Sequence, residues 1–198
     1  APIDFGFGLT NGVFWDVKAG IGRWEIFIKE YLPDLNEKKI LDLNPGLLEH
    51  FQRYQTDYHM QDGFVAKDAD HWNIDWYYSD AVFGPLYYGF GRPGEYADRW
   101  EGVKHYEETV MEKMPDMVLV LVKASPEKIK ERVIAGKSLF PERHKDSLMK
   151  SEDIDYILDR FQTLYNQSVI KNKFEIDTSS ATVKDSISEF VSNVEPIL

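Results

Sequence analysis

Apolar residues recur along the chain at two spacings, and the two alternate. Spacings of three and four positions predict helices at 24–31, 47–58, 95–113, from 126, 151–169 and 183–194. Short apolar or alternating runs between them predict strands at 12–17, 39–43, 63–67, 117–122 and 173–177. Strands separated by helices favour a parallel sheet covered on both faces. We therefore predict a three-layer α/β domain with a mostly parallel sheet of about five strands.

Three features of the sequence carry sharper local signals. Residues 117–122 are apolar on both faces, as expected for a central parallel strand. Ser125 is placed to cap the helix that follows, with Pro126 at its first position. Thr182, three residues before Asp185, predicts a capping box at the last helix.

The 198 residues contain no repeat or Gly/Ser linker, which favours one domain over residues 1–198. The net charge of -11 argues against nucleic acid as a partner. No run reaches the ~18 apolar residues of a membrane span, and the first residues lack a signal-peptide pattern, so we expect a soluble, intracellular protein without a membrane partner. Aromatic residues are dense at 72–90, which fits either core packing or a platform for a flat base.

The second half of the chain carries a family pattern. Pro115-Asp116 precedes the 117–122 strand, residues 123–127 follow it, and Arg132 lies in the next helix. Farther upstream, the strand ending at Asp68 leads to the aromatic, Ser-containing segment 76–83. In these features the chain resembles P-loop nucleoside and nucleotide kinases of the thymidylate-kinase and deoxynucleoside-kinase type.

The resemblance implies ATP and Mg²⁺ as cofactors and a small nucleoside or nucleotide as acceptor. It implies a lid at about 136–150 and an aromatic acceptor-side insertion at about 69–95. Arg132 and Arg143 would stabilise the charge of the transferred phosphoryl group, with Lys137 near the phosphates. Asp68 would orient the acceptor or bind Mg²⁺, although Ala69 stands where the family usually has Arg. The acceptor-side residues it implies are Trp72, Trp76, Tyr78 and Ser79.

The phosphate-binding loop departs from that family. The segment in the expected place, 17–27, offers Lys18, Gly20, Gly22 and Arg23 as nucleotide contacts. At the positions of the second Gly, the Lys and the hydroxyl of a Walker A motif it carries Trp24, Glu25 and Ile26. A carboxylate beside a triphosphate is repulsive, so the motif is degenerate.

Three functions therefore stay open. The chain is a phosphotransferase of this family, a kinase-fold protein without catalysis that serves as a binding or structural subunit or homo-oligomer, or a metal-dependent enzyme. The third depends on the carboxylate and imidazole groups of residues 57–75: Asp57, His59, Asp62, Asp68, Asp70, His71 and Asp75.

Overall fold

Two parallel strands and a set of helices make up the described part of the molecule. The computed structural model describes residues 42–62, 76–139 and 148–197. In chain order the elements are α4 (Pro45–His59), α6 (Trp76–Phe83), the π-helix η1 (Gly84–Tyr88), α7 (Arg99–Lys113), β1 (Val118–Lys123), α8 (Pro126–Leu139), the 3₁₀ turn η2 (Ser151–Asp153), α10 (Ile154–Gln167), β2 (Asn172–Asp177) and α11 (Val183–Val194).

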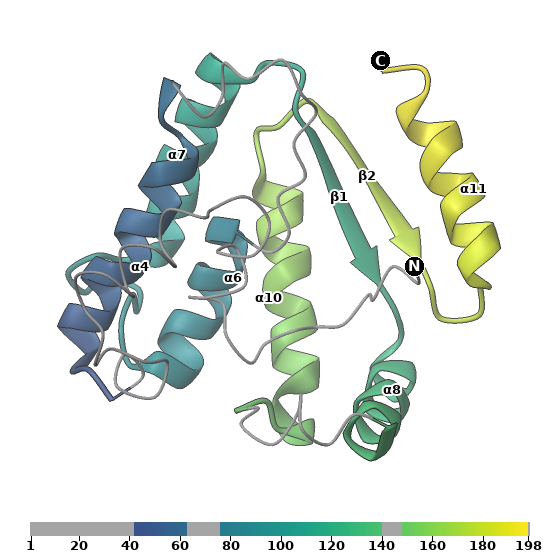
Figure 1. Cartoon of the computed structure of the whole chain (residues 1–198), viewed down its shortest axis with the longest axis horizontal. Helices are drawn as coiled ribbons and strands as arrows, with labels where there is room; N and C mark the ends of the chain where they lie inside the picture. Colours follow the sequence, from purple (N-terminus) through teal and green to yellow (C-terminus); the bar gives the residue numbers. More distant parts are fainter. Residues whose placement is uncertain (1–41, 63–75, 140–147, 198) are drawn as a thin grey trace, which may run out of the picture.

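The two strands lie side by side and parallel, with Val118 opposite Asn172 and Lys123 opposite Asp177. The chain passes from β1 to β2 through α8 and α10, as a parallel pair requires a long crossover. Figure 1 shows α10 beside β1, α11 beside β2, and α8 below the carboxyl ends of both strands. The strands and α8 therefore bring residues distant in sequence to one edge.

The main core lies on the helical side of the molecule, where α6 packs against α7 and α10 (Figure 1). Tyr77, Val82 and Val110 are almost completely buried in it, and the Phe83 ring meets Phe161 of α10 at 5.6 Å. Arg160 places its guanidinium 3.9 Å from the centre of the Trp100 ring, which links α10 to α7. Many aromatic side chains of segment 76–90 are thus part of the hydrophobic core.

Two helices begin where the sequence predicts caps, and a third begins later than predicted. Ser125 Oγ accepts the Lys128 amide at 3.2 Å at the start of α8. Thr182 and Asp185 form the predicted capping box at the start of α11. At α7, Asp98 accepts the amides of Trp100 and Glu101, so this helix begins at Arg99 and not near residue 95 as predicted.

The predicted fold class is wrong for the structure that is seen: the described residues contain one two-stranded sheet and six α-helices, a helix-dominated arrangement. The expected strands at 12–17 and 63–67 lie outside the described residues. Of the strand expected at 39–43, only Asp42 and Leu43 are described, and they form a turn because Asn44 accepts the Leu47 amide and starts α4. β1 is also only partly buried along its length, unlike the central strand predicted for 117–122.

Candidate functional site

Polar side chains gather where β1 and β2 end. Lys123, the last residue of β1, forms an ion pair with Glu175 of β2. The turn after β2 joins the same edge: Thr178 donates its amide to the Lys123 carbonyl at 2.8 Å, and Ser179 Oγ accepts the Ser125 amide at 2.8 Å. Ligands of open parallel sheets bind outside the carboxyl ends of the strands, so we take this edge as the candidate site.

Arg132 reaches this edge from α8. Its guanidinium donates through Nη1 to Thr178 Oγ1 at 2.8 Å and through Nη2 to the Thr178 carbonyl at 2.5 Å. The residue is exposed, and these bonds use only part of the donor set of a guanidinium. Arg132 is therefore held in a defined position with donors left for a ligand.

The acids at the edge are ionised and held by neighbours. The hydroxyl and amide of Ser179 donate to Asp177 Oδ1 and hold the pKa of that carboxyl below its usual value, with smaller contributions from Lys123 and Arg132. The Lys123 ammonium, followed by the Gln162 amide, lowers the pKa of Glu175. The same contact with Glu175 raises the pKa of Lys123. The positive charge of Lys123 is thus largely matched inside the protein.

Of the site residues predicted from sequence, only a few fall in the described part. Arg132 lies at the edge, and Lys137 belongs to the last turn of α8. Asp68, Arg143, Lys18, Gly20, Gly22, Arg23 and Trp72 lie outside the described residues. So does most of the predicted lid. Its last residues, 148–150, are described, and Met149 is buried in the main core.

The predicted base-stacking residues of α6 face the protein interior. Trp76 is buried, and Tyr78 donates its hydroxyl to Glu107, which is 2% exposed. Burial is the main reason that the pKa of Tyr78 is raised. Ser79 Oγ is buried and has no hydrogen-bond partner within the described part of the chain. In the structure described, Trp76 and Tyr78 are core residues and offer no open platform.

Glu107 was not singled out by sequence. Besides the Tyr78 hydroxyl it accepts the Val169 amide at 2.8 Å, so it ties α6 and the turn before β2 to α7. Lys123, Asp177 and Thr178 were also missed as a group. The sequence did contain a signal for these three residues. Each of them ends or follows a predicted strand, and the ends of parallel strands lie at the same edge of a sheet.

The residues proposed for a metal site are not close together in the described part of the chain. Asp62 pairs with Lys113 at 2.6 Å, and Asp57 lies beside the Tyr106 hydroxyl. Within 42–62, 76–139 and 148–197 no group of three or more His, Asp or Glu side chains is arranged to hold a metal ion. The other members of the proposed set, and the side chain of His59, lie outside the described part.

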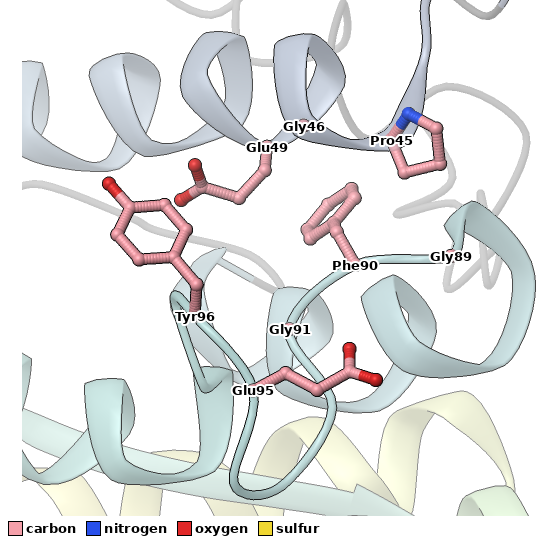
Figure 2. A pocket seen from close by; sticks show the side chains of 8 residues that line it. All are labelled: Pro45, Gly46, Glu49, Gly89, Phe90, Gly91, Glu95 and Tyr96. Atoms are coloured by element: carbon pink, nitrogen blue, oxygen red, sulfur yellow. The ribbon is translucent and has the colours of Figure 1, made fainter.

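A separate small pocket opens between the start of α4 and the loop after η1. Its volume is about 240 Å³. Figure 2 shows Glu49 and Tyr96 on one side of it, Pro45 and Gly89 on the other, and the Phe90 ring between them. It is lined by Pro45, Gly46, Glu49, Gly89, Phe90, Gly91, Glu95 and Tyr96.

Under this pocket lies a buried ion pair. Glu49 is 2% exposed, and its Oε1 lies 3.0 Å from Nη2 of Arg99, which is 5% exposed. Arg99 Nη2 donates to the Glu49 carbonyl at 3.2 Å. Arg53 lies 3.3 Å from the other carboxylate oxygen. Glu49 Oε1 itself has no hydrogen-bond partner among the residues described.

Comparison with known proteins identified no relative: no family model, curated protein or solved structure matches the chain. None of the helices in the described part has the length and apolar character needed to cross a bilayer.

Proposed function

We propose that the chain is a kinase-like nucleotide-binding protein that takes a nucleoside triphosphate at the carboxyl edge of β1 and β2. Transfer of the terminal phosphoryl group to a small acceptor is the reaction that its family resemblance implies. The observation that supports the proposal is the position of Arg132. A residue implied by sequence to contact phosphate lies, exposed and hydrogen-bonded, at the sheet edge where parallel α/β proteins bind ligands.

The chemistry of the edge suits Arg132 for this role. An Arg fork binds phosphate oxygens through charge-assisted hydrogen bonds that are about twice as strong as neutral ones. Thr178 fixes the fork before any ligand arrives, so less side-chain entropy is lost on binding. Lys123 contributes little net charge because Glu175 matches it, which leaves Arg132 as the main cation of the described edge.

The edge does not by itself make a magnesium site. Asp177 already accepts two hydrogen bonds from Ser179, and Lys123 and Arg132 lie near it. Magnesium in kinases is bound by one or two carboxylates together with the phosphates, and here the free carboxylate is missing from the described edge.

Titration calorimetry and thermal unfolding with ATP, with and without Mg²⁺, test this function. At ~100 Kd of ligand the free energy of unfolding should rise by about 2.7 kcal/mol, which raises the Tm by several degrees. Arg132→Gln should weaken ATP binding about tenfold. Arg132→Lys should recover only part of the affinity, because Lys lacks the fork.

The matched control is Lys128→Gln, which removes one positive charge from the same helix. Lys128 pairs with Glu131 one turn away, and loss of such an exposed surface pair changes stability little. Equal ATP affinity of Arg132→Gln and the wild type would show that Arg132 does not bind the phosphates. Absence of any nucleotide effect on the wild type would contradict the proposed function as a whole.

A second candidate, a binding or structural subunit, is favoured by α11. Val183, Ile187 and Val191 recur every four residues and form an apolar stripe that is 42 to 61% exposed, while Phe190 on the neighbouring face packs near Phe174 of β2. Light scattering over a concentration series distinguishes this candidate. A multimeric mass without nucleotide binding would support it, and a monomer that binds ATP would not.

A further inference from the structure

We propose that Thr178 is a positioning residue that occupies one edge of the Arg132 guanidinium and leaves another edge to bind two oxygens of a phosphoryl group. The free edge is formed by Nε–H and one N–H of Nη2. The inference rests on the proposed nucleotide site and specifies how that site holds its ligand. A guanidinium has five N–H donors in a fixed plane, so the donors already in use decide from which side an anion can bind.

Thr178 takes the end of the fork. Arg132 donates through Nη1 to Thr178 Oγ1 at 2.8 Å and through Nη2 to the Thr178 carbonyl at 2.5 Å. One residue can accept from both nitrogens only through the two parallel N–H groups at the end of the guanidinium, because the outer N–H groups point in opposite directions. The two oxygens of Thr178 therefore fill the place that a carboxylate takes in a bidentate pair.

The Thr178 hydroxyl is itself fixed by β1. It donates to the Lys123 carbonyl at 3.0 Å, and the Thr178 amide donates to the same carbonyl at 2.8 Å. A hydroxyl has only one hydrogen, and here that hydrogen points to the end of β1. The oxygen therefore faces Arg132 as an acceptor, so the end of β1 sets the position of the guanidinium through Thr178.

The side edge of the fork is open in the described part of the molecule. Among the residues described, no hydrogen bond uses Arg132 Nε, and the side chain is exposed. Two acids lie near Arg132, and both are engaged elsewhere. Asp177 accepts from Ser179. Glu131 pairs with Lys128 at 2.7 Å. The parallel N–H groups of Nε and Nη2 are thus left to match two oxygens of a phosphoryl group.

NMR of the Arg132 guanidinium in the full chain tests the inference, with ATP as the probe and adenosine as the probe without phosphate. Arg132→Gln identifies the signals by their loss. In the free wild type the Nη1 and Nη2 signals should be distinct, because the bonds to Thr178 stop rotation of the guanidinium. ATP should shift the Nε–Hε signal and leave the Nη contacts with Thr178 in place. Adenosine should leave the Nε–Hε signal where it is.

Thr178→Val removes Oγ1 and keeps the shape of the side chain. It should merge the Nη1 and Nη2 signals and weaken ATP binding about threefold to tenfold, which corresponds to the cost of immobilising one long side chain on binding. Thr178→Ser keeps the hydroxyl and should restore both the separate signals and the affinity.

Ser179→Ala is the matched control for a loosened turn. It removes the hydroxyl that accepts the Ser125 amide and donates to Asp177, but it leaves both oxygens that accept from Arg132. The Nη1 and Nη2 signals should therefore stay separate in this variant.

Three results would overturn the inference and leave the proposed function standing: ATP binding without a shift of Nε–Hε, displacement of Thr178 from the Nη groups by ATP, or separate Nη signals in Thr178→Val. Merged Nη signals in Ser179→Ala would also overturn it, because the whole turn and not Thr178 would then hold Arg132. Absence of any effect of ATP on the wild type would contradict the proposed function, and the inferred mode of binding falls with it.

Discussion

At the scale of single residues, the loop after η1 depends on glycine backbone conformations. Gly91 and Gly94 have φ of +76° and +77°, where residues with a Cβ are strained. A Cβ at Gly91 would lie 2.4 Å from Arg99 Cγ, whereas a Cβ at Gly94 would have no atom within 4 Å. The two positions share a backbone conformation and differ only in what surrounds them.

Alanine substitutions at Gly91 and Gly94 distinguish the cost of backbone strain from the cost of a steric clash. Gly94→Ala should lower the free energy of unfolding by about 1 kcal/mol, which is the cost of the left-handed conformation. Gly91→Ala should cost at least about 3 kcal/mol, because the clash moves Arg99 from its buried pair with Glu49. Urea denaturation of both variants measures the difference. Equal losses would mean that Arg99 moves aside freely and that the ion pair contributes little.

At the scale of elements, the boundaries follow local chemistry that the sequence displays. Ser125 and Thr182 are side chains that satisfy the first amides of a helix, and both predicted caps are found. α7 begins later than its apolar pattern suggests, because Asp98 caps it while residues 92–97 form turns. The start of a helix can be predicted when the sequence offers one capping residue. It is misplaced when several polar residues could each serve as the cap.

Glycine within α7 offers a stabilising change. Gly102 lies in the second turn of this helix, and a Cβ there would only touch Tyr106 at an ordinary distance of 3.9 Å. Gly102→Ala should therefore raise the free energy of unfolding by about 0.5 to 1 kcal/mol, since alanine loses less backbone entropy in a helix. A rise in Tm or urea midpoint with an unchanged helical signal checks this. A loss of stability would indicate that α7 has no room for the methyl group.

At the scale of the whole molecule, the sequence predicts the order of elements from residue 118 onward better than the architecture or the site. β1, α8, α10, β2 and α11 are found where apolar spacing predicts them. The five-stranded sheet was wrong because it required strands whose pairing no local pattern reveals, and Asp42 and Leu43 turn into α4 instead. Trp76 and Tyr78 pack in or against the main core, and the sequence left core packing and base stacking both open, because an aromatic cluster looks the same in either role.

The tyrosines of the core predict how stability depends on alkaline pH. Burial, with hydrogen bonds to Asp153 and Asp57, raises the pKa of Tyr87 and of Tyr106 to about 12. In the unfolded chain tyrosine ionises near ~10. Between these values the folded state binds more protons, so the stability from these groups is complete below about pH 10 and falls as the pH rises toward 12.

Urea denaturation across this range, together with the ultraviolet absorbance of phenolate, checks the alkaline prediction. The free energy of unfolding should decline above about pH 10, and the tyrosines whose pKa is raised, Tyr77, Tyr78, Tyr87 and Tyr106 among them, should ionise late. Tyr87→Phe should make the decline shallower. A flat stability profile, or phenolate formed by all tyrosines near their ordinary pKa, would contradict it.

The stacking of Arg160 on Trp100 gives this chain a built-in optical reporter. Indole emission responds to a charge held over its ring, and here that charge belongs to a different helix, 3.9 Å away. When α10 separates from α7, the emission wavelength and intensity of Trp100 should change, even if both helices remain helical. In a variant in which the other four of the five tryptophans are replaced by Phe, fluorescence therefore records the separation of these helices as an event distinct from the loss of helical circular dichroism.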